Sequence, residues 1–255
     1  MGLLPTQRTP PKRRLCDHTI FIFGPPKAGK TTLAARFPDA LILATEDGQG
    51  CLECYRAPVN DWPTFLALCN EIAQGKHPFL TLVVDTVDNL WALCQRFICE
   101  KHKVEHESDM PYGKGYGLVL AEFTRVLTKL SMLDYGLVLI SHAEQEEQQA
   151  RTGTYQRWVP SVRDKVRRFL LGMCDFILFV DQETTVGPDG QTVTSRFLRT
   201  KPSFRWIAGD RTGRLPESIP LDYDAFLAAF EAAQQCPAMP GPGNSATPQG
   251  EDHDQ

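Results

Sequence analysis

A single nine-residue segment constrains the fold of this chain more than any other part of the sequence. It reads Gly24-Pro25-Pro26-Lys27-Ala28-Gly29-Lys30-Thr31-Thr32 and matches the phosphate-binding loop G-x-x-x-x-G-K-[ST]. The apolar residues 19–23 before it are typical of a buried strand, and residues 32–37 open a helix. Strand, phosphate loop and helix together are the first unit of a parallel α/β sheet. The sequence therefore predicts an α/β protein that binds a nucleoside triphosphate.

The loop residues have distinct expected roles in binding that triphosphate. Gly24 and Gly29 allow the backbone to curl so that successive N–H groups face one anion. Lys30 would reach the β- and γ-phosphates, and the Thr31 hydroxyl would ligate Mg²⁺. We therefore expect residues 24–32 to bind the nucleotide and Thr31 to bind the metal.

The rest of the chain alternates apolar strands with amphipathic helices. Such alternation predicts a mostly parallel central sheet with flanking helices. Two β-rich runs on either side of Gly187-Pro188-Asp189-Gly190 add an antiparallel hairpin late in the chain. The expected strands lie at residues 40–44, 80–85, 137–142, 176–180 and 192–200, and the expected helices at 62–74, 87–103, 119–133, 162–171 and 224–234.

Composition sets the limits of the folded part. With 255 residues the chain is long enough for one large domain, which we expect at residues 17–235. Residues 1–16 are basic and residues 236–255 are acidic and rich in Pro and Gly, so both ends are expected to be disordered. A net charge of −4 is not typical of a protein that binds nucleic acid constitutively. The sequence has no secretory signal and no apolar run long enough for a membrane span, so we expect a cytoplasmic protein without membrane contact.

The eight cysteines are expected to be reduced thiols, because the chain lacks a secretory signal. Cys51 and Cys54 form one C-x-x-C pair, and Cys99, His102 and His106 could cluster on a helix. Each group is half of a zinc site without its second half, so the sequence does not favour structural zinc.

Three polar residues at strand ends point to nucleotide hydrolysis. Asp85 follows Leu82-Val83-Val84 and matches the second phosphate-site motif, whose carboxylate holds Mg²⁺. Glu46 ends the strand after the loop helix, and a carboxylate there can orient and deprotonate the attacking water. Asp47 is its rival for this role. His142 ends a later strand, where a polar group can sense the γ-phosphate.

In this order, the loop, Thr45-Glu46, Val84-Asp85 and Ile140-Ser141-His142 resemble the RecA-type ATPase core. More narrowly, the chain resembles phage-encoded RecA-like ATP-binding proteins, a group that includes short single-strand annealing proteins. Two stretches typical of that group lie at residues 109–116 and 208–216, and the resemblance covers residues 17–233.

This resemblance implies a RecA-like P-loop NTPase fold with ATP and Mg²⁺ as cofactors. It also implies Mg²⁺-dependent ATP hydrolysis, with Glu46, Lys30 and His142 as catalytic residues. RecA-type proteins place Gln at the sensor strand, whereas here the strand ends in His142 and Gln145 follows.

The resemblance further implies two kinds of partner. Segments 107–117 and 144–160 correspond to the DNA path, so Arg151, Tyr155, Arg157 and Trp158 are expected to bind single-stranded DNA. The basic helix with Arg167 and Arg168 would assist, although Trp158 could instead belong to the core. A homo-oligomer is also implied, in which Arg199 and Lys201 would reach a neighbour's nucleotide. An ordinary pair at a hairpin end is the alternative.

Three functions remain open from the sequence. The favoured one is an ATPase that binds single-stranded DNA in phage recombination, annealing or repair, in the cytoplasm of the bacterial host. The second is an accessory ATPase acting on a protein partner in replication or packaging. The third is a small-molecule P-loop kinase, with Arg163, Arg167 and Arg168 as its lid.

Overall fold

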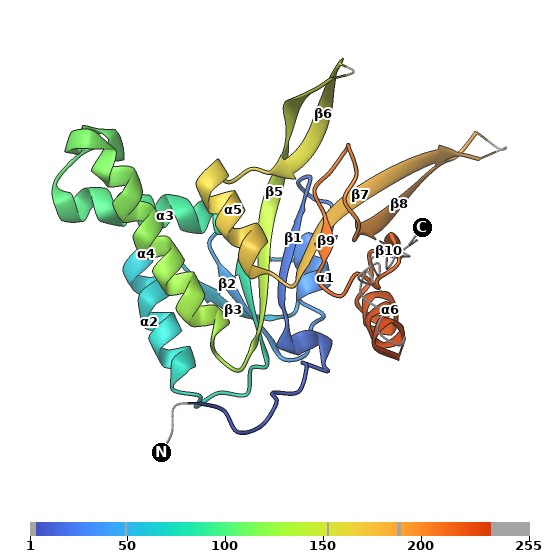
Figure 1. Ribbon diagram of the computed structural model, residues 1–255, viewed down its shortest axis with the longest axis horizontal. Helices are drawn as coiled ribbons and strands as arrows, with labels where there is room; N and C mark the ends of the chain where they lie inside the picture. Colours follow the sequence, from blue (N-terminus) through green and yellow to red (C-terminus); the bar gives the residue numbers. More distant parts are fainter. Residues whose placement is uncertain (1–3, 49, 152, 188–189, 236–255) are drawn as a thin grey trace, which may run out of the picture.

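The computed structural model describes residues 4–48, 50–151, 153–187 and 190–235. At its centre lies a ten-stranded sheet, in which β7, β1, β5, β4, β2 and β3 are neighbours in that order and run parallel (Figure 1). The expected α/β class with a mostly parallel sheet is therefore confirmed. The strands are β1 (Thr19–Gly24), β2 (Ala40–Ala44), β3 (Tyr55–Pro58), β4 (Thr81–Asp85), β5 (Gly136–Ala150), β6 (Gly153–Pro160), β7 (Phe176–Val186), β8 (Thr192–Arg199), β9 (Gly209–Asp210) and β10 (Ser218–Pro220).

Helices cover both faces of the sheet, because strand residues alternate between two hydrophobic cores. Phe21 and Phe23 of β1 pack in the core beneath α2, α3, α4 and α5. Ile20 and Ile22 pack in the core beneath α1 and α6. The helices are α1 (Lys30–Ala34), α2 (Trp62–Ala73), α3 (Val87–His102), α4 (Lys114–Ser131), α5 (Asp164–Met173) and α6 (Tyr223–Gln235), with short 3₁₀ turns η1 (Leu15–Asp17), η2 (Glu107–Asp109) and η3 (Pro111–Gly113).

The phosphate-loop strand lies between the two strands that extend furthest. β1 pairs with β5 on one side and with β7 on the other. Both neighbours continue past the carboxyl edge of the sheet and turn back as hairpins, β5–β6 and β7–β8, which project from the body in Figure 1. The loop after β1 therefore emerges between the bases of two arms.

Residues 144–160, for which the sequence predicted neither a strand nor a helix, form the β5–β6 arm. This segment is an antiparallel ladder that runs from the pair Ala143 and Pro160 to the pair Ala150 and Gly153. Its second half is rich in the β-branched and aromatic types that favour strands. Because both hairpin faces carry polar residues for most of their length, the alternation that marks a half-buried strand is absent.

The late hairpin is confirmed, and its first strand is longer than expected. β7 runs to Val186 instead of ending near residue 180, and β8 pairs with it antiparallel. Pro188 and Asp189 of the expected turn lie outside the described residues.

The packed chain begins two residues before the expected boundary at residue 17. Leu15 and Cys16 are buried in η1, and Leu15 packs in the core under α6. The whole of the expected acidic tail, residues 236–255, lies outside the described part of the chain, as do residues 1–3. Among the described residues, no helix is both long and apolar enough to cross a membrane.

The stretch at residues 208–216 is a loop organised by one buried carboxylate. Asp210 accepts hydrogen bonds from the backbone N–H of Thr212 at 2.8 Å and of Leu215 at 2.7 Å. The Thr212 hydroxyl and the Lys201 ammonium donate to the same carboxylate at 2.6 and 3.2 Å. Its neighbour Arg211 lies 3.2 Å from Asp175, which ties the loop to the start of β7. The residues of this motif therefore stabilise a turn.

The stretch at residues 109–116 builds a compact tip between α3 and α4. An ideal Cβ on Gly115 would lie 2.1 Å from the carbonyl oxygen of Glu107, so only glycine allows this close approach. Glu107 is buried and accepts from Arg163 at 2.7 Å, which holds the tip against the start of α5. Tyr112, with a positive φ of 58°, is 97% exposed at the tip.

Candidate nucleotide-binding site

The phosphate loop has the geometry that its sequence requires. Gly29 adopts a φ of 102°, in the left-handed region, directly before α1. The Lys30 side chain is buried in the loop and donates to the carbonyl oxygens of Gly24 at 2.9 Å and Pro25 at 2.8 Å. Burial lowers the pKa of Lys30, while the negative charges of Asp85, Asp88 and Glu46 act in the opposite direction. The loop therefore concentrates one ammonium group near three carboxylates at the edge of the sheet.

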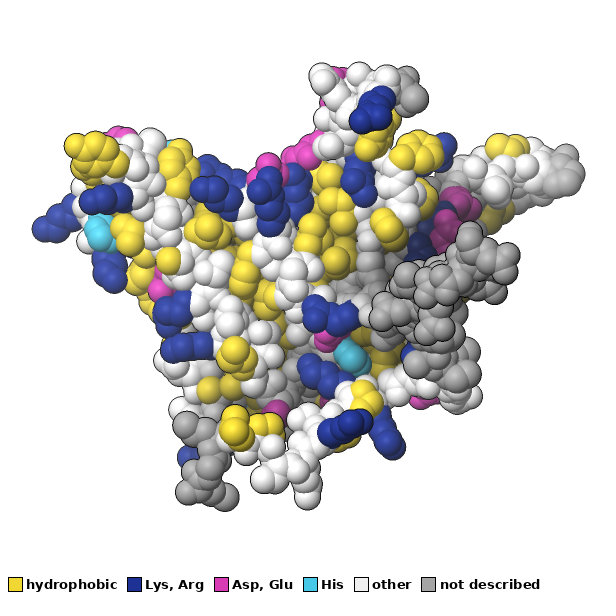
Figure 2. Space-filling view, viewed as in Figure 1, with side chains coloured by type: hydrophobic (Ala, Val, Ile, Leu, Met, Phe, Trp, Pro, Cys, Tyr) yellow, Lys and Arg dark blue, Asp and Glu magenta, His cyan; other side chains and the backbone are white. Residues whose placement is uncertain are grey.

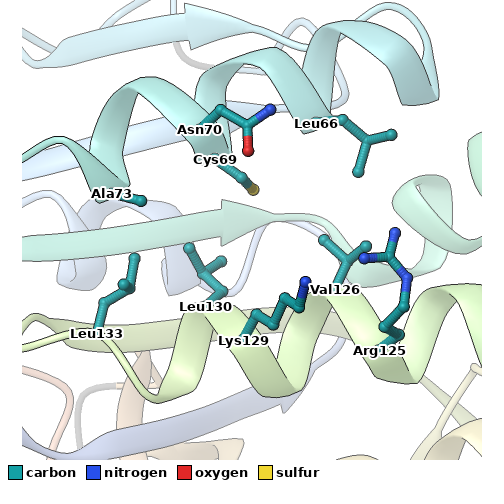
Figure 3. Close-up of a pocket in the computed structure, with 9 residues that line it drawn as sticks. All are labelled: Leu66, Cys69, Asn70, Ala73, Arg125, Val126, Lys129, Leu130 and Leu133. Carbon is teal, nitrogen blue, oxygen red and sulfur yellow. The ribbon is translucent and has the colours of Figure 1, made fainter.

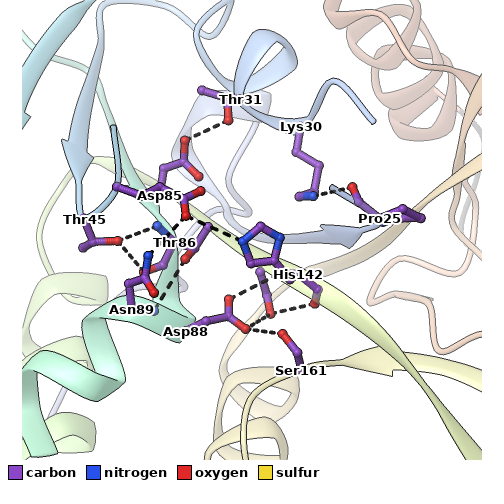
Figure 4. Close-up of polar contacts among 12 residues, drawn as sticks. Pro25, Lys30, Thr31, Thr45, Asp85, Thr86, Asp88, Asn89, His142 and Ser161 are labelled. Carbon is purple, nitrogen blue, oxygen red and sulfur yellow. Dashed lines mark hydrogen bonds and ion pairs between the residues drawn. The ribbon is translucent and has the colours of Figure 1, made fainter. Parts of the chain in front are cut away.

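The two residues expected to hold Mg²⁺ lie side by side. The Thr31 hydroxyl donates to an Asp85 carboxylate oxygen at 2.8 Å (Figure 4). Thr31 lies in the first turn of α1 and Asp85 ends β4, so the fold brings together residues that are far apart in the sequence. A hydroxyl and a carboxylate are the hard oxygen ligands that Mg²⁺ prefers. This donor pair fits the ion that the motif implies.

Glu46 lies closer to this cluster than its rival Asp47. The Asn89 amide donates to the Glu46 carboxylate at 3.1 Å, and the His142 Nε2 atom lies 3.7 Å from the same oxygen. Asp47 is 97% exposed and pairs with Arg56 at 3.4 Å. The geometry thus favours Glu46 over Asp47 as the group that would orient water.

Asp88 connects Ser141 and His142 on β5 with Ser161 just past β6, and the sequence did not predict this role. Its carboxylate accepts from the His142 backbone N–H and from the Ser141 hydroxyl, each at 3.2 Å. The Ser161 hydroxyl, just past β6, donates to the same carboxylate (Figure 4). A polar residue in the first turn of the helix that follows Asp85 was the available signal, because that turn lies beside the phosphate site.

A hollow beside the loop is a second feature that the sequence did not reveal. It lies between α1 and the β8–α6 side of the sheet, and Thr32, Arg196 and Tyr223 contribute to its lining. The Arg196 guanidinium lies 3.6 Å from the position of an ideal Cβ on Gly29. The hollow is therefore continuous with the loop and carries a cation and an aromatic ring.

The residues expected to bind DNA all lie on the β5–β6 arm, but Trp158 has a packing role. Its half-buried ring stacks on Phe179 with a centroid distance of 6.1 Å. Its backbone N–H donates to the Arg205 carbonyl at 2.7 Å. Arg151 is exposed near the turn, whereas Tyr155 and Arg157 are half-buried along β6. DNA contact by these residues stays a prediction, and Trp158 fits better as a residue of the core.

The basic helix α5 contributes less free charge than expected. Arg167 is buried and pairs with Glu146 at 2.8 Å and with Asp164. It therefore fixes the arm to the body and is not available to contact DNA. Arg168 is exposed, and Figure 2 shows basic and hydrophobic side chains gathered over α5 and the bases of the arms.

The expected subunit-interface residues are engaged within their own chain. Arg199 pairs with Asp181 at 2.7 Å and with Glu183, and its guanidinium lies 5.1 Å from the centre of the Trp206 ring. Lys201 pairs with the buried Asp210. Both cations stabilise the β7–β8 side of this chain, and contact with a neighbouring subunit stays a prediction.

A crevice between α2 and α4 lies on the helical face of the molecule, with Leu66, Cys69 and Val126 in its lining (Figure 3). Burial raises the pKa of the Cys69 thiol to about 12, so this thiol is not a nucleophile at neutral pH. Within the described part of the chain, the cysteines form no disulfide and no group of His, Cys, Asp and Glu has a metal-site arrangement.

The fold and the site define a P-loop nucleotide-binding protein with a RecA-like core. More narrowly, the chain belongs to the AAA domain family, whose model matches residues 17–212.

The chain is also similar to a curated protein of prophage origin. The SPbeta prophage-derived uncharacterized protein YorG of Bacillus subtilis (strain 168) is 27% identical over 136 residues. The match covers 50% of this chain and 42% of YorG, so this chain accounts for less than half of the length of its relative. Among solved structures, the flagellar accessory protein FlaH of Methanocaldococcus jannaschii is 11% identical, with a TM-score of 0.41, over 80% of this chain and 84% of FlaH. We draw no functional conclusion from that likeness.

Proposed function

We propose that the protein binds and hydrolyses Mg²⁺-ATP and couples this cycle to binding of single-stranded DNA in phage recombination, annealing or repair. The observation that carries the proposal is the convergence of Lys30, Thr31, Asp85, Glu46 and His142 on one edge of the sheet. The strand that bears the phosphate loop lies between the two strands that form the arms.

Each group in the site has a defined task in this proposal. Lys30 neutralises charge on the β- and γ-phosphates, and Thr31 and Asp85 hold the ion. Mg²⁺, when bound, supplies positive charge to the phosphate oxygens. Glu46 accepts a proton from the attacking water, with Asn89 fixing its carboxylate through the 3.1 Å hydrogen bond. The hollow with Arg196 and Tyr223 would hold the ribose and the base.

His142 would transmit the state of the γ-phosphate. Its imidazole faces Glu46, and its backbone N–H is bound by Asp88, which also binds Ser161 at the base of the arm. A movement of His142 would therefore be transmitted through Asp88 to the arm that we propose for DNA binding.

A small-molecule kinase is less well supported by the geometry. Its lid would need free arginines, but Arg163 pairs with buried Glu107 and Arg167 pairs with Glu146. An accessory ATPase that binds a protein remains the second candidate, because Tyr112 presents an almost fully exposed ring on the α3–α4 tip.

The test is ATP binding and turnover with and without oligo-dT. We expect binding of a slowly hydrolysed ATP analogue and turnover that changes when oligo-dT is added. Lys30→Ala should weaken nucleotide binding about ten- to a hundredfold, as expected for loss of a charged hydrogen-bond donor. Lys129→Ala, at an exposed position on α4, is the matched control. Unaltered affinity in Lys30→Ala would refute the nucleotide site, and turnover indifferent to DNA would favour the protein-partner alternative.

A further inference from the structure

The segment 202–206 lies against the β5–β6 arm and presents an aromatic ring and a cation outward. The Trp158 N–H donates to the Arg205 carbonyl at 2.7 Å, and the Ile207 N–H donates to the Trp158 carbonyl at 3.3 Å. Trp158 and Trp206 thus form a parallel bridge that adds this segment to the edge of β6. The segment is fixed by backbone hydrogen bonds to the arm.

Pro202, Phe204 and Arg205 of this segment are exposed, whereas Ser203 and Trp206 are half-buried. Phe204 is 63% exposed, and what distinguishes it from a single exposed apolar side chain is the pair of side chains in contact with its ring. The Arg205 guanidinium lies 5.4 Å from the centre of the Phe204 ring, and the Tyr155 ring meets Phe204 edge-on at 6.3 Å. Three side chains from two segments therefore form one surface cluster, in which Phe204 and Arg205 are exposed and Tyr155 is half-buried.

The support beneath the cluster is rigid. The Trp206 ring stacks on Phe179 of β7 at 5.7 Å with an interplanar angle of 18°, and its indole N–H donates to the Lys201 carbonyl at 3.1 Å. The ring of Trp158 stacks on the same Phe179. Because these indoles are used for packing, Phe204 and Tyr155 are the rings left for an external partner.

The two segments that carry the cluster are positively charged. Residues 148–158 and 200–208 contain four cations, Arg151, Arg157, Lys201 and Arg205, and no Asp or Glu, whereas the partner strand β5 carries Glu144, Glu146 and Glu147 nearer the body. The residue opposite Tyr155 on the partner strand is the neutral Gln148. The residue opposite Arg157 is Glu146, and that carboxylate is already paired with Arg167. Lys201 is paired with Asp210, so the arginines supply the available charge.

We propose that Phe204, Arg205 and Tyr155 form a stacking platform for the bases of single-stranded DNA, with Arg157 and Arg151 along the path of its backbone. This inference rests on the proposed function and names a segment, 202–206, to which the sequence assigned no role. Exposed rings bind unpaired bases by stacking, and arginines bind phosphates, a combination that recognises single strands with little sequence preference. An acidic protein surface would use the arginines but would leave the face of Phe204 without a complementary group.

The test is fluorescence anisotropy of labelled oligo-dT with the full chain and two pairs of variants. Phe204→Ala should weaken binding about ten- to a hundredfold and leave the salt dependence nearly unchanged, because stacking involves no counterion release. Arg205→Ala should reduce the slope of log affinity against log salt by about one phosphate contact. Tyr55→Ala is the control for Phe204, because Tyr55 is 60% exposed on the far edge strand β3, and Lys129→Ala is the control for Arg205.

The outcomes separate this inference from the proposed function. If the native chain binds oligo-dT and Phe204→Ala binds equally well, the platform is refuted and DNA binding stands. If the native chain binds no oligo-dT with or without the ATP analogue, DNA binding itself fails. Heparin is a polyanion without bases, so the native chain and Phe204→Ala should bind it equally well. If Phe204→Ala loses affinity for heparin and for oligo-dT in parallel, stacking is also refuted.

Discussion

Replacing Glu46 by Gln tests the catalytic centre with the least structural disturbance. The Asn89 amide donates to the Glu46 carboxylate at 3.1 Å, and the oxygen of a glutamine amide can accept the same hydrogen bond. The side chain is partly exposed, so no buried charge is removed and the thermal unfolding temperature should hardly change. What the amide cannot do is accept a proton from water.

The size of the effect follows from this loss. A positioned general base contributes about 10²–10⁴-fold to a rate, which corresponds to about 2.7–5.4 kcal/mol of barrier. We therefore expect kcat to fall by about that factor in Glu46→Gln, while affinity for the ATP analogue stays within about twofold, because we assign phosphate binding to Lys30 and the loop and not to Glu46. A lower kcat with an unchanged affinity for the ATP analogue would show that the hydrolysis step is impaired and nucleotide binding is not.

The assay is phosphate release under single-turnover conditions, with nucleotide binding measured in parallel. Asp47→Asn is the matched control, since Asp47 is the next residue, carries the same charge and points to solvent. Normal turnover in Glu46→Gln together with slow turnover in Asp47→Asn would show that we assigned the wrong carboxylate.

Four further outcomes follow from the structure. Asp88→Asn replaces an acceptor of three hydrogen bonds by an amide that cannot satisfy all three donors. Urea unfolding should therefore show a free energy of unfolding about 1–3 kcal/mol lower than that of the native chain, and an unchanged midpoint would contradict the role of Asp88. If the hollow beside Gly29 holds part of the nucleotide, Arg196→Ala should weaken nucleotide binding severalfold without altering stability. Titration calorimetry measures the first effect and thermal unfolding the second. Burial alone would raise the pKa of Asp210, but the hydrogen bonds from Thr212, Leu215 and Lys201 outweigh it and hold the pKa below its usual value. This stabilisation is present above about pH 4 and is lost as the pH falls through the folded-state pKa, so Asp210→Asn should be less stable at pH 7 and should approach the native chain near pH 2 in denaturant titrations. The protein should also self-associate with the ATP analogue, and light scattering that shows a strict monomer would refute this.

Local patterns were enough to predict the parts of the site that sit on regular elements. The loop at residues 24–32 and the strand that ends at Asp85 each carry their signal in adjacent residues, and parallel strands bring their ends to one edge. The expected helices at residues 62–74 and 87–103 lie within one or two residues of α2 and α3, because their apolar side chains recur at helical spacing.

Features that depend on tertiary pairing were not predictable in the same way. Trp158 and Arg167 both belong to polar, basic stretches, and composition alone favoured an exposed role for them. In the structure, the ring of Trp158 has Phe179 to stack on, and Arg167 has two carboxylates, one on the arm and one in the first turn of its own helix. These side chains can be buried because each has a partner in the folded chain. Phe179 and Glu146 lie on other elements than Trp158 and Arg167, so the local sequence does not reveal these contacts.

The position of the phosphate loop between two arms gives a physical reason to expect coupling between nucleotide and DNA. Asp88 accepts hydrogen bonds both from the His142 backbone and from Ser161, where the β5–β6 arm rejoins the body. On the other side, the β7–β8 strands carry Phe179, which stacks on Trp158 of the arm, and Arg196, which adjoins the loop. A γ-phosphate that displaced His142 would therefore act on the base of the β5–β6 arm through Asp88. One that displaced Arg196 would act on it through the β7–β8 strands. Coupling by such contacts requires two arrangements of the arm that differ in affinity for DNA. The effect of oligo-dT on ATP affinity must then equal the effect of ATP on oligo-dT affinity, because the two describe one free energy.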